Sequence, residues 1–377
     1  MSRDICLLAD TLGFMSGGGH FWVYLNWALG LRSNGVRVHW LEPIPDGIDD
    51  EELGRRVDTL RGRLRPHGLD GSVSVCAWTR DNPQVVPPPG CADFGEVAAR
   101  SDLLINFTYS MPPTVLDRFR RTALVDIDPG LTQLWLSSGQ IRIASHTTYF
   151  TTGETVGAGV PDCGLRWTYV PACVDLQAWP ATPSPDDAPF TTVSGWHADE
   201  WVSTADGYYC NDKRHGFLPF LDLPNLTRQP LELALNLGDA AAADSERRTL
   251  AARGWRVRHA YEVAGAPDDY RRYIQHSRGE FSAVKPSCVR LQNAWISDRT
   301  LCYLASGKPV IVQHTGPSRF LPQDAGMFRF RTVQEAARML DAVASDYVKQ
   351  CRFARALAEE HFDACRVSRS LLQRALP

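Results

Sequence analysis

The sequence predicts an α/β protein of two domains, each built on a parallel sheet. Its 377 residues exceed what one ordinary hydrophobic core accommodates, and typical domain sizes suggest about two domains. Apolar runs alternate with helical segments in both halves, and strand–helix–strand units imply parallel sheets. The proline-rich segment WPATPSPDDAP between the halves is typical of an extended linker. We therefore place the domain boundary between residues 185 and 186.

Composition places the chain among ordinary globular proteins and excludes several functional classes. Apolar residues make up 44% of it and charged residues 22%, and the net charge of −3 gives no bulk attraction to nucleic acid. The ten cysteines include no CxxC pair, and we expect no metal site. No apolar run approaches the roughly 18 residues that cross a bilayer, and a signal-peptide core is missing. We expect a cytoplasmic protein without a membrane span or nucleic-acid partner, and the oligomeric state stays open.

A strand–helix–strand unit with a glycine-rich turn opens the chain. Residues 4–9 form an apolar run, glycines occupy positions 17–19, and residues 21–33 are apolar around most of a helical circumference. VRVHWLE then forms the second strand. The turn reads SGGGH, which is a weak match to the GxGxxG dinucleotide fingerprint. The pattern places His20 at the N-terminus of the helix.

Further strands follow in the first half. The apolar runs at residues 102–108 and 122–128 are separated by a proline-started helix, and another strand is expected at 146–151. Asp126 and Asp128 lie where the second of these runs ends. Open α/β sheets bind ligands at the carboxyl ends of their strands, so both aspartates are candidates for a site.

The second half repeats the alternation of strands and helices. Its strand candidates are FTTVSGW, PLELALNL and WRVRHAYE. Residues 281–316 then predict a loop, a short helix opened by Ser297 and Asp298, and a buried strand over 310–313. The remainder, from about residue 333 to 376, is helical by composition.

His20 is the candidate general base. The positive end of a helix dipole disfavours a histidine cation, so a histidine at this place is suited to accept a proton. A capping or packing histidine fits the position equally well. Asp126 or Asp128 could orient the imidazole from a neighbouring strand end, although the DxDP sequence also fits an Asx turn.

A second group of residues suits a phosphate. Lys285 precedes the helix that Ser297 and Asp298 open, and a helix N-terminus beside an ammonium group can hold a diphosphate. The other members of the group are Lys213, Arg299, Thr315 and Gly316. The ordinary alternatives are solvated cations and, for the HTG sequence, a simple turn.

Two segments resemble the GT-B glycosyltransferases. SGGGHFWVYLNWALGLRSNGVRVHWLE is similar to their opening, in which a glycine-rich loop and a histidine begin the first helix. LCYLASGKPVIVQHTG is similar to their donor-side segment, commonly EALASGxPVI. The resemblance implies two Rossmann-like domains facing across a cleft. Residues 1–185 would bind the acceptor, residues 186–354 the nucleotide-sugar donor, and a C-terminal helix over 355–377 would cross back to the first domain.

The resemblance also implies an activity. A glycosyltransferase of the hexosyltransferase type would move a sugar from a nucleotide-diphosphate sugar to a hydroxyl of a small-molecule acceptor, without cofactor or metal. In inverting members a histidine at the position of His20 is the base, paired with an aspartate near Asp126 and Asp128. The expected donor-binding residues are Gly18, Gly19, Lys213, Lys285, Ser297, Asp298, Arg299, Thr315 and Gly316.

The chain departs from the retaining members of the superfamily. Those often carry two glutamates around the donor helix, and here Ala294 and Cys302 occupy these places. The departure favours an inverting enzyme and leaves the nucleotide unidentified. A GT-B nucleotide-sugar epimerase and a non-catalytic two-domain ligand-binding protein remain the alternatives.

Overall fold

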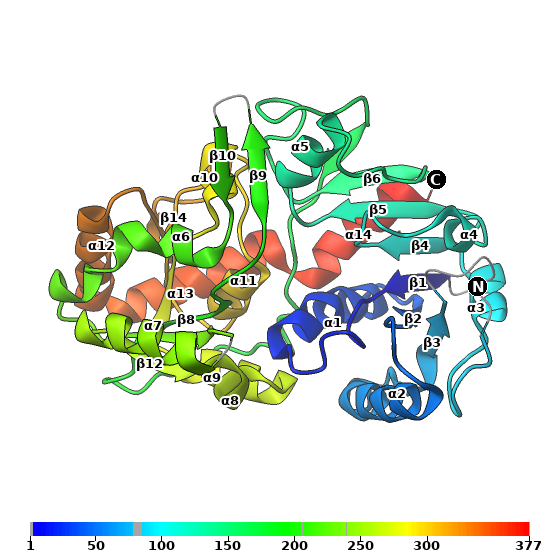
Figure 1. Cartoon of the computed structure of the whole chain (residues 1–377), viewed down its shortest axis with the longest axis horizontal. Coiled ribbons are helices and arrows are strands. Elements are labelled where there is room, and N and C mark those ends of the chain that lie inside the picture. Colours follow the sequence, from blue (N-terminus) through cyan, green and yellow to red (C-terminus); the bar gives the residue numbers. More distant parts are fainter. Residues whose placement is uncertain (1–2, 78–84, 205–206, 239, 377) are drawn as a thin grey trace. The chain divides into compact units, whose positions relative to one another are not determined.

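The computed structural model describes residues 3–77, 85–204, 207–238 and 240–376. The chain folds into two compact units (Figure 1). The first comprises Met1–Gly157, Pro161–Asp175 and Asp363–Pro377, and the second Ala158–Val160 and Leu176–Phe362. Among the described residues, no helix combines the length and the apolar character needed to cross a membrane.

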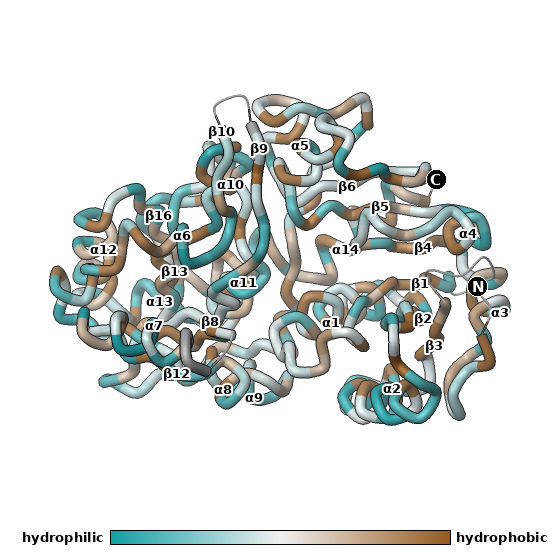
Figure 2. Tube along the Cα trace, in the orientation of Figure 1, coloured by the Kyte–Doolittle hydropathy of each residue, from teal (hydrophilic) through white to brown (hydrophobic). Residues whose placement is uncertain are grey.

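The first unit is built on a seven-stranded parallel sheet. Its strands are β1 (Asp4–Leu8), β2 (Arg37–Pro43), β3 (Val73–Cys76), β4 (Leu103–Asn106), β5 (Thr122–Asp126), β6 (Thr148–Thr151) and β7 (Trp167–Tyr169). Their spatial order is β3-β2-β1-β4-β5-β6-β7, so the order reverses between β1 and β4. The central strands are short apolar runs, largely brown in Figure 2, because helices bury both of their faces.

Helices cover this first sheet. They are α1 (Gly18–Ser33), α2 (Asp50–Leu64), α3 (Phe94–Arg100), α4 (Pro113–Leu116), α5 (Leu131–Ser137) and α14 (Ala364–Ala375). α1 is apolar around most of its circumference and buries Trp22 and Trp27. The more polar α2 buries a single stripe that includes Leu53, Val57 and Leu60.

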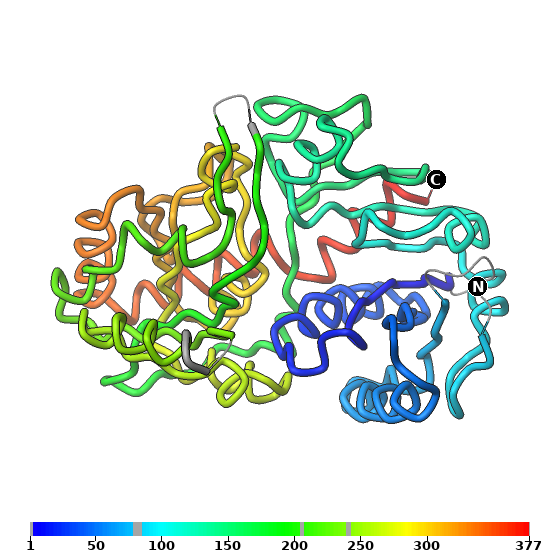
Figure 3. The backbone as a smooth tube through the Cα atoms, viewed as in Figure 1, coloured from blue at the N-terminus to red at the C-terminus, as the bar shows by residue number. Residues whose placement is uncertain are grey.

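The last helix of the chain packs on the first. The side-chain amide of Asn34 donates to the carbonyl of Cys365 (2.8 Å) and to the hydroxyl of Ser368 (3.0 Å). Gly30 lies so close to α14 that a Cβ atom on it would be 2.4 Å from the carbonyl oxygen of Ala364. The C-terminal segment, red in Figure 3, is therefore part of the first unit.

The second unit contains a second seven-stranded sheet and a separate hairpin. The sheet strands are β8 (Phe190–Gly195), β11 (Leu231–Asn236), β12 (Arg256–His259), β13 (Gly279–Ser282), β14 (Val310–Gln313), β15 (Asp324–Ala325) and β16 (Met327–Phe330). Their order is β12-β11-β8-β13-β14-β16-β15, and only β15 is antiparallel to its neighbour. The hairpin consists of β9 (Trp201–Thr204) and β10 (Gly207–Cys210).

Eight helices of the described chain belong to this unit. They are α6 (Lys213–Phe217), α7 (Ala240–Ala252), α8 (Ala260–Ala264), α9 (Pro267–His276), α10 (Pro286–Arg290), α11 (Asp298–Ala305), α12 (Val333–Ser345) and α13 (Tyr347–Leu357). Aromatic side chains dominate the core that they enclose with the sheet. Phe281 stacks on Phe330 at a ring separation of 5.3 Å and meets Phe217 edge-on at 6.1 Å.

The division between the units differs from the predicted boundary at residues 185 and 186. It falls between Asp175 and Leu176, because the proline-rich segment packs on the second unit and is not an extended linker. Trp179 is fully buried, and the Thr182 amide donates to the carbonyl of Ser306 (3.1 Å). The returning segment begins at Asp363, after a π-helical turn that extends α13, and not at residue 355 as predicted.

Most central elements lie where the sequence predicts them, and the shorter ones do not. β1, β5, β14 and α11 match their predicted segments within a few residues. β3, β7 and the β9–β10 hairpin were not predicted, and the loop expected from residue 281 begins inside β13. These strands have three or four residues, which is too short for a periodic pattern to identify them.

We expect the substitution Gly30→Ala to destabilise the first unit. The added methyl group would overlap the Ala364 carbonyl and push α14 away from α1. Overpacking of this kind costs about 2 kcal/mol, which denaturant unfolding measures as a lower midpoint.

Gly62→Ala is the matched control. Gly62 lies on the exposed side of α2, and a Cβ atom there meets nothing within 4 Å. Alanine in an open helix interior should raise stability by roughly 0.5–1 kcal/mol. Equal midpoints for Gly30→Ala and the parent would contradict the α1–α14 packing.

Candidate functional site

In the first unit, candidate residues gather where the strand order reverses. An open parallel sheet binds ligands at the carboxyl ends of the strands that flank such a reversal. β1 is followed there by Asp10, Thr11 and the turn into α1. Gly18 and Gly19 are the first residues of α1, and no side chain caps this N-terminus. The first N–H groups of α1 therefore suit a polar or anionic ligand.

His20 is held in one tautomer at this helix start. Its Nε2 atom lies 2.6 Å from the carbonyl oxygen of Asp10. Because a carbonyl oxygen can only accept, Nε2 carries the hydrogen and Nδ1 is the basic nitrogen. The ring packs against Phe14 and Tyr24, with centroids 4.8 and 5.1 Å away. Burial lowers the pKa of His20, and Asp10 offsets this only in part, so the imidazole is neutral at pH 7.

Glu42 fixes the loop that leads to His20. Its carboxylate accepts hydrogen bonds from the backbone N of Thr11 (2.7 Å) and Leu12 (3.1 Å), from Nε1 of Trp40 (2.7 Å) and from the hydroxyl of Thr11. Despite these bonds, complete burial raises the pKa of Glu42 to about 8. Glu42 acts on the imidazole through the loop and is a positioning residue.

The predicted pairing of His20 with Asp126 or Asp128 is not the one observed. Asp126 ends β5 and is buried. Four donors occupy its two oxygens: Thr132 Oγ1 (2.8 Å), Gln133 Nε2 (2.9 Å), Thr151 Oγ1 (2.9 Å) and the backbone N of Asp128 (3.1 Å). The bond from Asp128 is that of an Asx turn, and Asp128 itself is exposed. The observed partner of His20 is Asp10.

In the second unit, the strand order reverses between β8 and β13, and two lysines lie beyond these strands. Lys213 begins α6, and its Nζ atom donates to the carbonyl of Ala283 (3.2 Å) and lies 5.8 Å from the ring centre of Trp295. Lys285 follows β13 and pairs with Glu200 at 2.9 Å. Lys213 and Lys285 thus lie at one edge of the second sheet.

The charge of Lys213 responds to its surroundings. Burial, followed by repulsion from Arg299 and Lys285, lowers the pKa of Lys213 to about 7. An anion bound beside it would favour the protonated form. Lys213 is therefore suited to gain its charge together with a phosphate ligand.

Arg299 has a different role from the donor binding that the sequence predicts. Its Nε atom lies 2.8 Å from Oε1 of Glu280, whose side chain is fully buried. The other guanidinium nitrogens donate to the carbonyl of Val193 (2.9 Å) and to the hydroxyl of Ser282 (2.6 Å). Arg299 thereby joins α11 to β8 and β13, and these bonds leave it a structural cation.

A narrow pocket with an interior of about 20 Å³, which is room for about one water molecule, lies at the same edge of the second sheet. It is lined by Ser282, Val284, Trp295, Ile296, Ser297, Thr300, Val312, Gln313, Thr315, Leu321, Met327 and Arg329. Ser297 is the N-cap of α11, yet its hydroxyl makes no capping hydrogen bond, and Asp298 is the first residue of that helix.

The loop before α11 is strained and held by the HTG turn. Gln292 and Ala294 have φ values of +48° and +55°, which side-chain-bearing residues rarely adopt. The hydroxyl of Thr315 donates to the carbonyl of Trp295 (2.7 Å), and a Cβ atom on Gly316 would lie 2.4 Å from the carbonyl oxygen of Gln292. Thr315 and Gly316 thus shape the pocket by holding its loop. Strain of this kind is concentrated at ligand sites.

Several solved structures that share the fold of this chain over its whole length are glycosyltransferases. HepE of Anabaena in complex with UDP aligns with a TM-score of 0.60 and 13% identity over 99% of both chains. Sucrose-phosphate synthase of Thermosynechococcus elongatus aligns with a TM-score of 0.56 and 12% identity, over 99% of this chain and 98% of that one. An α-glucosyltransferase in complex with UDP aligns with a TM-score of 0.61 and 10% identity over both entire chains. The chain has the GT-B fold.

The GT-B fold expected from the sequence is thereby confirmed, while sequence comparison alone finds no relative. No family model matches the chain, and no curated protein matches it. At identities of 10–13% the likeness shows the fold and not the activity.

Three residues of this GT-B chain's candidate sites escaped the sequence analysis. Asp10 acts through its backbone carbonyl, which every residue has. Glu42 is an acidic residue near the end of β2, in an otherwise apolar run. This unusual position was the feature of the sequence that could have identified it. Trp295 lies in the strained loop, which no periodic pattern describes.

We expect Glu42 to make stability depend on pH. Its pKa in the folded chain, about 8, lies above the unfolded value, so the folded chain binds more protons between about pH 5 and 8. The free energy of unfolding should fall as pH rises through this window, on the order of 2–4 kcal/mol, relative to Glu42→Gln. Urea unfolding at pH 5 and 8 measures this. Glu51→Gln, at an exposed position of α2, is the control; a constant difference between parent and Glu42→Gln would contradict the assignment.

Proposed function

We propose that the chain is an inverting glycosyltransferase that moves a sugar from a nucleotide-diphosphate sugar to a hydroxyl of a small-molecule acceptor. One observation carries the proposal: in a GT-B fold, the sheet edge of the second unit combines a lysine poised near neutrality with a pocket beside it. Neighbours crystallised with UDP and UDP-glucose support a uridine nucleotide as the donor class.

The donor would lie against Trp295, at the mouth of the pocket, and against the two lysines. Trp295 lines the pocket and lies below the ammonium group of Lys213, so a base placed against this ring brings its diphosphate toward Lys213 and Lys285. Two ammonium groups can neutralise the charge that develops on the leaving diphosphate, the role that a metal ion has in other transferases.

His20 would act as the general base. The acceptor oxygen forms the new bond to the anomeric carbon as the bond from this carbon to the diphosphate breaks. The acceptor proton goes to Nδ1 of His20, and the bonding electrons leave with the nucleoside diphosphate. The hydrogen bond from Nε2 to the Asp10 carbonyl becomes stronger when the ring is charged and so stabilises the imidazolium.

We expect UDP affinity to fall as pH rises through the pKa of Lys213. A group with a pKa of about 7 is mostly charged at pH 6 and mostly neutral at pH 8. The parent should lose about tenfold in affinity across this interval relative to Lys213→Arg, whose guanidinium stays charged. Calorimetric titration measures it, with the exposed Lys349→Arg as control. Parallel pH profiles for the parent and Lys213→Arg would remove Lys213 from the site.

We expect His20→Ala to lower the rate of transfer by about 10²–10⁴-fold while UDP binding stays unchanged. In the parent, kcat/KM should fall on the acid side with a midpoint below the ordinary histidine pKa of about 6.5, because burial keeps the ring neutral. UDP release from UDP-sugars, with a panel of hydroxyl acceptors, measures the rate.

UDP release together with analysis of the sugar products, with and without acceptor, separates the alternatives. A transferase releases UDP only as an acceptor is glycosylated, an epimerase converts the donor without acceptor, and a binding protein releases nothing. His276→Gln, at an exposed position of α9, is the control for loss of a histidine. Transfer by His20→Ala at the parent rate would disprove the base assignment.

A further inference from the structure

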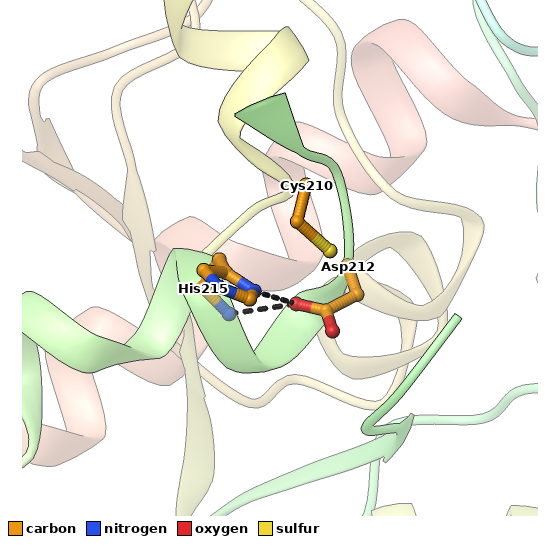
Figure 4. Close-up of side chains that lie close together, drawn as sticks. All are labelled: Cys210, Asp212 and His215. Carbon is orange, nitrogen blue, oxygen red and sulfur yellow. Dashed lines mark hydrogen bonds and ion pairs between the residues drawn. The ribbon is translucent and has the colours of Figure 1, made fainter. Parts of the chain in front are cut away.

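Three side chains with different metal-binding atoms meet at the start of α6 (Figure 4). Cys210 is the last residue of β10, Asp212 is the N-cap of α6, and His215 lies in the first turn of that helix. One sulfur, one oxygen and one nitrogen atom of this trio lie within 4.8 Å of one another. In the part of the chain that the structure describes, no other group of three such residues is this compact.

Helix capping explains only part of this arrangement. Oδ1 of Asp212 accepts a hydrogen bond from the backbone N of His215 (2.8 Å) and lies 2.7 Å from Nδ1 of the same residue. These are the contacts of an ordinary N-cap. The thiol of Cys210 is also hydrogen-bonded to Asp212, and Nδ1 of His197 lies 3.8 Å from the second oxygen, Oδ2, of that residue. Capping of the helix requires neither of these two side chains.

We propose that Cys210, Asp212, His215 and His197 bind one zinc ion. Zinc takes thiolate, imidazole and carboxylate ligands in a tetrahedron with bonds of about 2.0–2.3 Å, which places neighbouring ligand atoms about 3.4 Å apart. The separation between His197 and Asp212 is already near this value. The His215 ring reaches it by moving away from Oδ1 by roughly an ångström, and both imidazoles are free to rotate because their side chains are 42% and 50% exposed.

The charges around the cluster also suit a divalent cation. A Cys210 thiolate and the Asp212 carboxylate together balance the charge of Zn²⁺, and two neutral imidazoles complete the set. The neighbouring cationic side chains interact with groups outside the cluster. Lys213 donates to the carbonyl of Ala283, and Arg214 pairs with Glu246 at 2.7 Å.

The zinc ion would link the β9–β10 hairpin to α6. Such a site would contradict the expectation from the sequence that the chain has no metal site. Cys210 belongs to the hairpin, while Asp212 and His215 belong to the cap and first turn of the helix. Zinc binding at this cluster involves no step of sugar transfer and is independent of the proposed activity.

The test is zinc binding by the full-length chain. The protein is stripped with EDTA, titrated with Zn²⁺ against a chromophoric chelator, and compared with Cys210→Ser and His215→Gln. Cys91→Ser and His276→Gln, which change the same residue types away from the cluster, are the matched controls. We expect one equivalent of zinc to be retained by the parent and by both controls, and lost by both cluster variants.

Cobalt binding by the parent protein tests the thiolate ligand without any substitution, so the result does not depend on whether the variants fold. Co²⁺ should give the charge-transfer band of a thiolate ligand and the intense visible bands of a tetrahedral site. The proposal is overturned if the parent retains no stoichiometric zinc, if Cys210→Ser binds zinc as the parent does, or if the cobalt spectrum shows no thiolate band.

Discussion

The reversal of strand order in each sheet is the constraint on which the candidate sites depend. Parallel strands end at one edge, and on either side of the reversal their connections turn to opposite faces, which leaves the strand ends between them open to a ligand. β1 and β4 flank this point in the first unit, and β8 and β13 flank it in the second. His20 lies beyond the end of β1 at the first of these points. Lys213 and Lys285 lie at the sheet edge of the second.

Buried ionisable groups hold both of these edges in place at a cost in solvation. Glu42 accepts four hydrogen bonds, and the ion pair of Arg299 with Glu280 joins three elements. Breaking the Arg299–Glu280 pair would leave a charge in the core, which is far more costly than the net worth of the intact pair. Removing a donor from Glu42 would leave a buried polar atom without its partner. Both therefore specify the geometry of a loop or strand end more than they add to stability.

A feature could be predicted from the sequence where the interactions that form it are between residues close together in the chain. The glycine-rich turn, His20 and the segment around α11 are local patterns, and the structure places them as predicted. The contacts of Arg299 and Asp126 could not be predicted because their partners, Glu280 and Thr151, are distant in sequence and lie on strands. A cation at a helix start looks the same in sequence whether it faces a ligand or the core. The proline-rich segment likewise has the composition of a linker, and only tertiary packing shows that it covers the second unit.

The exposure of the two acidic partners determines which cations a diphosphate can recruit. Glu280 is fully buried beneath Arg299, so no ligand replaces it without leaving a buried carboxylate unpaired. Glu200 and Lys285 keep 22% and 30% of their side chains exposed, so solvent reaches this pair and partly screens it. In the proposed donor site, a diphosphate that displaced Glu200 would turn that carboxylate toward solvent and gain Lys285, while Lys213 would gain a proton. Donor binding of this kind changes one ion pair and preserves the other, which keeps the sheet edge rigid as its charge is neutralised.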